Sequence, residues 1–218
     1  MDKISIKDLY KHQSDFIDNE VTISGWVRTV RDSKTFGFIE LNDGSYFNNL
    51  QIVFNNELSN FEDICKLTIS STIIAIGKII KTENAKQPFE MHATSIEIFN
   101  LSDADYPLQK KRHSFEYLRT VAHLRPRTNT FSAVFRIRSV AAFAIHEYFQ
   151  SHGYVYVHTP IITCADCEGS AEMFKLTTLN LDEPLPKKDG KTDFSQDLFG
   201  RKAYITGSGQ LHGETFAS

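Results

Sequence analysis

The sequence has no excess of basic residues and no long hydrophobic run. Its 24 lysines and arginines face 27 aspartates and glutamates, which leaves a formal charge of −3. No overall positive field therefore attracts nucleic acid, and any such partner must be bound by local basic patches. The longest apolar run, Thr72–Gly77, is far too short to span a bilayer, and no hydrophobic segment follows Met1. We therefore expect a cytoplasmic protein without a membrane partner.

Cysteine is also scarce, with three residues among 218. Such low usage is typical of a reducing compartment. Cys164 and Cys167 form a CxxC pair, but there is no second pair, and the nearest following histidine is His212. Because a closed zinc site needs about four ligands, we expect no metal site here.

The first hundred residues are patterned as strands. Val21, Ile23 and Val27 fall on one face of the first run, and Gly25 within that run predicts a bulge or bend. The pattern fits a five-stranded OB-fold barrel over residues 1–102, although a short β-sandwich would leave a similar trace. The expected strands are Glu20–Arg31, Phe36–Asn42, Leu50–Phe54, Thr68–Lys81 and Glu90–Asn100, with a short helix at Glu57–Cys65 before the fourth.

Residues 103–127 form a basic hinge or linker. Between Leu108 and Arg127 a single acid, Glu116, faces six cations. A solvated linker helix would have this composition, and so would a joint that lies along a phosphate backbone. The cations are Lys110, Lys111, Arg112, Arg119, Arg125 and Arg127.

From residue 128 onward the apolar period is helical. It predicts one long helix that begins with Thr128 or Thr130 as N-cap and ends at His152-Gly153. Apolar residues occupy more than one face, so a second surface should cover the helix, either a sheet of this chain or the same helix of another protomer. A strand is expected at Tyr154–His158, and the polar segment Leu181–Phe199 predicts an exposed, mobile insertion.

Four residues of the predicted barrel suit nucleic-acid binding. They are Arg28, Arg31, Phe38 and Gln51, on three successive strands. An OB-fold stacks bases on aromatic rings and reads their edges with polar side chains. Phe38 would stack a base, Gln51 offers a donor and an acceptor, and the arginines would hold phosphate or a second base. Any one of these residues alone would more often be a core or surface residue.

The segment Ala203–Thr215 contains no cation. It carries Ser208, Gln210 and Glu214 directly behind a short apolar stretch. A site that admits a neutral amide instead of a carboxylate would lack a cation in this way.

Four segments resemble the class IIb aminoacyl-tRNA synthetases. The family's anticodon-binding barrel is similar to GWVRTVRDSKTFGFIELNDGS followed by LQIVF. Its motif 1 is similar to HLRPRTNTFSAVFRIRSVAAFAIHEYFQSHGYVYVHTPIIT, and its amino-acid-pocket segments are similar to CEGSAEMF and YITGSGQLHGE. The resemblance implies an OB-fold barrel followed, over residues 128–218, by the start of an α+β catalytic domain with an antiparallel sheet and a long motif 1 helix.

The resemblance also implies roles for single residues. Phe38 and Gln51 would bind the central uridine of the anticodon, with Arg28 and Arg31 nearby. Glu168 would meet the α-ammonium group of the amino acid, because a carboxylate favours the cationic amine. The pocket would further include Ser208, Gln210, Gly213 and Glu214.

In this family motif 1 packs across a two-fold axis. The resemblance therefore implies a homodimer whose interface includes Phe135, Arg138 and the fixed proline of motif 1, Pro160.

The position three residues after Gln210 points to asparagine as the substrate. Aspartate-specific members of the family carry a lysine there, in a QLxK pattern, but this chain has Gly213 followed by Glu214. A substrate carboxylate beside Glu214 would be buried and unpaired, at a cost of several kcal/mol. A neutral amide can donate its NH₂ to Glu214 instead, so the resemblance is to the asparagine-specific branch, which activates asparagine with ATP and transfers it to tRNA(Asn).

Two further motifs of the family, which hold the α-phosphate and the adenine of ATP, do not occur in these residues. The resemblance implies ATP and Mg²⁺ for the complete enzyme, but the catalytic residues remain unknown, and we expect the 218-residue chain alone to be inactive. Two alternatives remain: a non-catalytic tRNA-binding paralogue of a synthetase, and a generic OB protein that binds single strands.

Overall fold

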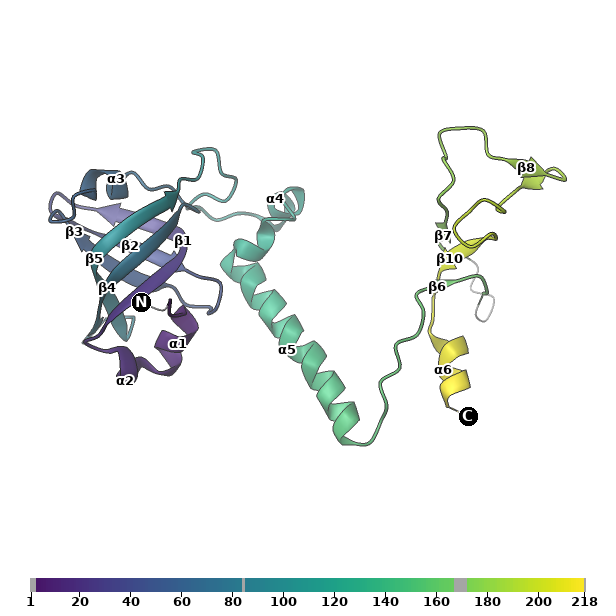
Figure 1. The fold of residues 1–218 in the computed structure, drawn as a ribbon, viewed down its shortest axis with the longest axis horizontal. Helices are drawn as coiled ribbons and strands as arrows, with labels where there is room; N and C mark the ends of the chain where they lie inside the picture. Colours follow the sequence, from purple (N-terminus) through teal and green to yellow (C-terminus); the bar gives the residue numbers. More distant parts are fainter. Residues whose placement is uncertain (1–2, 84, 167–171, 218) are drawn as a thin grey trace. The chain divides into compact units, whose positions relative to one another are not determined.

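The computed structural model describes residues 3–83, 85–166 and 172–217. The chain forms two compact units, residues 1–140 and 141–218 (Figure 1). Their border falls within one long helix. The borders expected at residues 102 and 127 remain predictions.

The first unit contains a closed five-stranded barrel, as predicted. Its strands pair in the order β1-β2-β3-β5-β4, and β4 closes the barrel against β1. The only parallel pair among the described strands joins β3 to β5, an arrangement that fits the OB-fold. The strands are β1 (Glu20–Asp32), β2 (Phe36–Asn42), β3 (Leu50–Asn55), β4 (Thr72–Lys81) and β5 (Phe89–Asn100).

Alternating side chains fill the interior of the barrel. In β2, Gly37, Ile39 and Leu41 are buried while the residues between them are partly exposed. Branched aliphatic residues dominate the core, because they pack well on a pleated surface. A core built in this way turns every second residue of β2 and β3 outward, so these strands can display polar and aromatic groups.

The bulge lies at Arg28 and not at Gly25, where the sequence pattern placed it. Pairing between β1 and β2 runs from Val27 opposite Leu41 directly to Thr29 opposite Glu40, so that Arg28 is the extra residue. Gly25 is required for a different reason. A Cβ atom there would lie 2.7 Å from the backbone oxygen of Asn42, so only glycine permits this close approach of strands.

Three short helices accompany the barrel. The helices α1 (Ile6–Lys11) and α2 (Gln13–Phe16) precede it and were not foreseen from the sequence. The backbone N–H of Ile6 donates to Asp43 Oδ2 at 2.8 Å, which ties α1 to the β2–β3 turn. The predicted helix before β4 is confirmed as α3 (Phe61–Cys65).

The linker leads from the barrel into the long helix. It contains α4 (Phe115–Thr120) and the 3₁₀ turn η1 (Arg125–Arg127), followed by α5 (Asn129–Ser151). Thr128 caps α5 as predicted, because its Oγ1 accepts from the N–H of Phe131 at 3.4 Å. Gly153 follows the helix with a φ of +84°, the left-handed conformation that ends helices.

The second unit contains a three-stranded antiparallel sheet in the order β6-β10-β7 and a separate hairpin, β8–β9. Its elements are β6 (Ile162–Thr163), β7 (Lys175–Leu176), β8 (Lys187–Lys188), β9 (Lys191–Thr192), β10 (Ala203–Ile205) and α6 (Gln210–Phe216). The strand predicted at Tyr154–His158 is wrong, since these residues have no strand partner and Val155 is 85% exposed. No helix among the described residues is long and apolar enough to cross a membrane.

Candidate nucleic-acid interface and amino-acid pocket

Three of the four predicted nucleic-acid-binding residues share the outer face of the barrel. Phe38 of β2 lies opposite Arg31 of β1 and opposite Val53 of β3. Gln51 lies opposite Glu40, one outward position along the same ladder. The alternation of the strands therefore brings an arginine, an aromatic ring and an amide together on one surface.

A second aromatic ring extends this surface. The ring of Phe36 packs edge-on against that of Phe38, with centroids 5.5 Å apart, and Phe36 is 43% exposed. An exposed aromatic residue two positions from Phe38 on the same strand is a signal that the sequence analysis missed. The two rings are perpendicular, so each presents its own face to a base instead of one shared stacking plane.

A polar network fixes the amide of Gln51. Its Nε2 donates to Glu90 Oε2 at 2.8 Å, and His92 Nε2 lies 3.0 Å from Glu90 Oε1. Glu90 and His92 alternate on β5, beside β3, and sequence reasoning missed both. Because one N–H of Gln51 is bound to Glu90, the amide carbonyl is directed as an acceptor.

Arg28 does not join this group. Its Nη1 donates to the backbone oxygen of Arg127 at 2.7 Å, and its Nη2 donates to Asn129 Oδ1 at 3.3 Å. Burial lowers the pKa of its guanidinium from the ordinary value. Arg28 thus points to the linker, while Arg31 is exposed on the barrel face.

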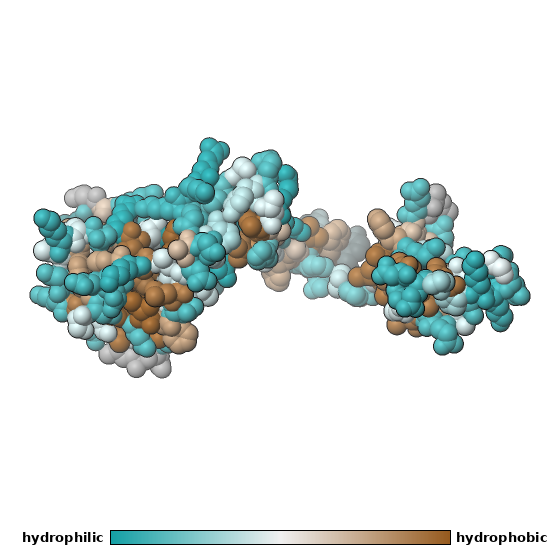
Figure 2. Space-filling view, turned by 90° about the horizontal axis from the view of Figure 1, so that it is seen from above, coloured by the Kyte–Doolittle hydropathy of each residue, from teal (hydrophilic) through white to brown (hydrophobic). Residues whose placement is uncertain are grey.

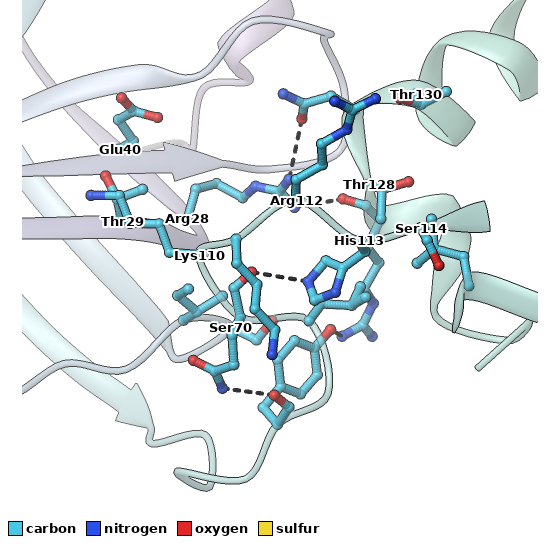
Figure 3. A pocket seen from close by; sticks show the side chains of 18 of the residues that line it. Arg28, Thr29, Glu40, Ser70, Lys110, Arg112, His113, Ser114, Thr128 and Thr130 are labelled. Atoms are coloured by element: carbon cyan, nitrogen blue, oxygen red, sulfur yellow. Dashed lines mark hydrogen bonds between the residues drawn. The ribbon is translucent and has the colours of Figure 1, made fainter. Parts of the chain in front are cut away.

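A cavity of about 860 Å³ lies between the barrel and the linker in the first unit (Figure 3). Two carboxylates, Glu40 and Glu116, line it. They are outnumbered by five cations, namely Arg28, Lys110, Lys111, Arg112 and Arg127. We call this cavity the basic cleft; its charge favours an anionic ligand.

The two remaining cations of the linker, Arg119 and Arg125, do not line this cleft. Arg119 lies 3.9 Å from Glu116, and Arg125 lies over the ring of Phe131, 4.9 Å from its centroid. An exposed ion pair of this kind contributes little stability.

In the second unit, the predicted pocket residues lie around the start of α6. Gln210 Nε2 donates to Glu214 Oε1 at 2.8 Å, and the N–H of Gln210 donates to Ser208 Oγ at 3.1 Å. Residues four apart on a helix share one face, so the three polar groups form one cluster. A Cβ atom added at Gly213 would meet nothing within 4 Å, which leaves open space at this position. Glu168 lies outside the described residues.

The sheet brings distant segments to this cluster. β10, which leads into the cluster, pairs with β6 on one side and with β7 on the other. A Cβ atom at Gly209 would lie 2.6 Å from Thr159 Oγ1, so the turn after β10 packs closely on the segment before β6. Residues 167–171 precede β7, and the resemblance placed the ammonium-binding carboxylate in that segment.

The residues expected at a dimer interface are accessible or partly accessible in the single chain. Arg138 and Pro160 are exposed, and Phe135 is half-buried against Phe131. The apolar face of α5 is largely uncovered, with Ile137 68% exposed. Figure 2 shows exposed apolar residues in both units.

The described residues contain no group of three or more histidine, cysteine, aspartate or glutamate side chains that could hold a metal ion. Cys164 is an exposed free thiol, and Cys167 lies outside the described residues. No residue described here is therefore assigned to a metal.

Two family models match the chain. Residues 21–99 match the OB-fold nucleic acid binding domain, and residues 114–212 match the class II tRNA synthetases (D, K and N). The second match identifies residues 114–212 as similar to the class II tRNA synthetases (D, K and N).

Two curated relatives are asparagine–tRNA ligases. The chain is 62% identical over 213 residues to an asparagine–tRNA ligase of Acetivibrio thermocellus, covering 97% of the chain and 46% of the relative. It is 58% identical over 214 residues to the asparagine–tRNA ligase of Clostridium beijerinckii, covering 98% and 46%. The chain thus spans about half the length of the curated relatives it matches.

The fold also matches a solved structure. The asparaginyl-tRNA synthetase of Pyrococcus horikoshii, complexed with asparaginyl-adenylate, has a TM-score of 0.78 and 23% identity. The match covers 99% of this chain and 45% of that one. It confirms the predicted architecture, an OB-fold barrel followed by the start of a class II catalytic domain.

Proposed function

We propose that the chain is the N-terminal part of an asparagine–tRNA ligase, which activates asparagine with ATP and transfers it to tRNA(Asn). The observation that carries the proposal is the 62% identity, over nearly the whole chain, to a protein of that name. The two candidate sites, one for nucleic acid and one for an amino acid, suit the two substrates that such a ligase must bring together.

The outer face of the barrel binds the anticodon in this proposal. Phe38 stacks the central base, and Arg31 neutralises a nearby phosphate. The carbonyl of Gln51 accepts from a base N–H, because Glu90 already holds one amide N–H at 2.8 Å. Uracil has an N–H at N3, whereas cytosine has a lone pair there and carries its N–H donors on N4, so a Gln51 carbonyl that faces N3 favours uridine over cytidine.

The basic cleft would hold the phosphate backbone of the same tRNA. Five cations line it and only two carboxylates oppose them. Of the two readings of the linker composition, the cleft favours the phosphate-binding joint, because cations on a purely solvated helix need not converge on one cavity.

The cluster at the start of α6 would select the amino acid. Glu214 accepts from Gln210 Nε2 and would also accept from the substrate amide. Glu168 would bind the α-ammonium group, and Ser208 holds the N–H of Gln210. The absence of a cation at Gly213 would exclude aspartate, because its side-chain carboxylate would lie unpaired beside Glu214.

ATP and Mg²⁺ belong to the proposed reaction. Mg²⁺ would neutralise the phosphates of ATP while the adenylate forms. The described residues offer no metal-binding group, so no step is assigned to them.

The uncovered apolar face of α5 supports a homodimer. Its exposed residues, Ile137 among them, would be buried against the partner's α5. Sedimentation of the full-length protein with Ile137→Glu should give the mass of a monomer, whereas the unmodified protein should give that of a dimer. A dimer that survives this substitution would contradict the assignment of this face.

Amino-acid-dependent ATP–pyrophosphate exchange by the full-length protein tests the proposed function. Asparagine should support exchange, and aspartate should support it at least about a hundredfold less, since every 1.4 kcal/mol is a factor of ten. Equal exchange with aspartate would overturn the specificity. Absence of exchange with any amino acid, together with retained tRNA binding, would identify a non-catalytic tRNA-binding paralogue.

A further inference from the structure

Arg28 of the barrel forms two hydrogen bonds to the linker and the start of α5. The bulge in β1 frees it from the two-residue alternation, so Arg28 and Thr29 both line the basic cleft (Figure 3). Its guanidinium donates to the backbone oxygen of Arg127 at 2.7 Å and to Asn129 Oδ1 at 3.3 Å. These acceptors lie at the end of η1 and at the first residue of α5.

The geometry requires arginine at this position. A guanidinium presents its N–H groups as a planar fork and can satisfy two acceptors on different residues simultaneously. The ammonium of lysine is a compact point charge on a flexible stem, so it would keep the charge without holding both acceptors in one orientation. The substitution Arg28→Lys therefore keeps the positive charge and removes the contact with two acceptors at once, so the two contributions can be measured apart.

Two other bonds support the same joint. Arg127 Nη1 donates to the hydroxyl of Tyr106 at 3.0 Å, and Arg136 Nη2 donates to the backbone oxygen of Gly44 at 2.8 Å. Both link the segment around the start of α5 to residues that precede it in the first unit. Arg28 lines one cavity together with Tyr106 and Arg127, and a second together with Gly44 and Arg136.

We propose that Arg28 is a positioning residue for nucleic acid. Arg28 does not contact the bound strand itself. It holds η1 and the start of α5 against the barrel, so that the linker cations converge on the basic cleft. The inference rests on the proposed function only in taking tRNA as the ligand.

The salt dependence of tRNA binding tests this role in the full chain. A protein that neutralises Z phosphates loses affinity with a logarithmic slope of about −0.9Z on duplex and about −0.7Z on single strands. If Arg28 positions the linker, several linker cations lose their alignment in Arg28→Lys and in Arg28→Ala. Both variants should then show a less steep salt dependence, by more than the slope of about 0.7 to 0.9 that one phosphate contributes. If Arg28 contacts a phosphate directly, Arg28→Ala should lose the slope of about one phosphate and Arg28→Lys should retain it. That result would overturn the proposal.

Arg31 supplies the matched control. It is an exposed arginine three residues away on the same strand, and among the described residues its side chain forms no hydrogen bond to the linker. We expect Arg31→Lys to keep most of the affinity that Arg31→Ala loses. The fold-change in tRNA affinity caused by Arg28→Ala should also be smaller in the Asn129→Ala background, since the two side chains share one bond. Fully independent effects of Arg28 and Asn129 would count against the proposed contact.

Hydrogen exchange tests the same role without tRNA, and the amides of β2 and β3 report whether the barrel of the variant is folded. In Arg28→Lys, the amides of residues 121–131 should exchange faster while those of β2 and β3 remain protected. Unchanged exchange in residues 121–131 would overturn the positioning role, even if the protein does not bind tRNA. Failure of the unmodified chain to bind tRNA, with faster exchange in Arg28→Lys, would overturn the proposed function and leave the joint established.

Discussion

At the scale of single residues, hydrogen bonds on the barrel face restrict what Gln51 can recognise. A free glutamine amide can rotate to present either its donor or its acceptor, so it discriminates poorly between base edges. Glu90 and His92 form a chain of bonds that ends on Gln51 Nε2. The remaining acceptor then faces a base that must supply an N–H group.

Phe38→Ala should weaken tRNA binding by about 1–3 kcal/mol, the usual contribution of one stacked base, which is about 5- to 150-fold in Kd. Phe99→Ala is the control, because Phe99 is a highly exposed aromatic residue on β5 outside the Phe36–Phe38 pair. Anisotropy titrations with labelled tRNA at fixed salt measure both. Equal losses in the two variants would contradict a specific stacking role for Phe38.

Gly213→Lys should lower asparagine-dependent pyrophosphate exchange by the full-length protein at least about tenfold. The new cation would pair with Glu214 and remove the acceptor proposed for the substrate amide. Because a Cβ at Gly213 meets nothing within 4 Å, a clash of the added Cβ does not explain such a loss. His212→Lys adds the same charge one position earlier on α6 and should change exchange little; unchanged exchange in Gly213→Lys would contradict the account of this pocket.

Residue identity and spacing predicted part of the candidate site. The placement of Arg31, Phe38 and Gln51 on one face follows from strand alternation, which sequence reveals directly. The direction of Arg28 could not be predicted, because one extra residue in β1 alters the alternation and leaves no mark in the hydrophobic pattern. Glu90 was missed because the contact between β3 and β5 joins strands far apart in the chain.

At the scale of elements, a single buried carboxylate anchors the polar segment before β10. Asp197 Oδ1 accepts from the N–H and the hydroxyl of Thr178, and Oδ2 accepts from the hydroxyl of Thr177 at 2.6 Å. These bonds place the pKa of Asp197 well below its ordinary value. The segment Leu181–Phe199 is largely exposed as predicted, but this end of it is fixed to the residues after β7.

Asp197→Asn should therefore destabilise the chain in a pH-dependent way. A depressed carboxyl pKa contributes stability above the unfolded pKa, and this contribution is lost as pH falls through the folded pKa. The thermal midpoint of the variant should lie below that of the unmodified chain at pH 7, and the difference should shrink below about pH 4. Asp189→Asn is the control, because asparagine tolerates the left-handed backbone there, where φ is +52°. A difference that persists undiminished at pH 2 would contradict the role of the charge.

The long elements of the chain were predictable, and the short ones were not. The barrel strands and α5 carry enough periodic residues for the pattern to dominate, and their ends agree closely with the structure except at the start of β4, which was predicted at Thr68 and lies at Thr72. α6 was missed because its seven residues include a glycine and little periodicity. The apolar run Tyr154–His158 has the composition of a strand, but a strand also needs a partner, which composition does not reveal.

At the scale of the whole molecule, the two units divide the work of the proposed ligase. The first unit carries the barrel face and the basic cleft, and the second carries the polar cluster before and within α6. Binding of the nucleic acid should therefore depend on residues 1–140 and selection of the amino acid on residues 141–218. Substitutions in one set should leave the other property unchanged.

Discrimination at the central anticodon base tests the account most directly. Affinities of the full chain should be measured at one salt concentration for tRNA(Asn) and for the same transcript with the central uridine replaced by cytidine. An unsatisfied acceptor on Gln51 costs about 1–3 kcal/mol, so cytidine should weaken binding about 5- to 150-fold, and Gln51→Ala should abolish most of that difference. Equal affinities for the two transcripts would contradict the assignment of the barrel face to the anticodon.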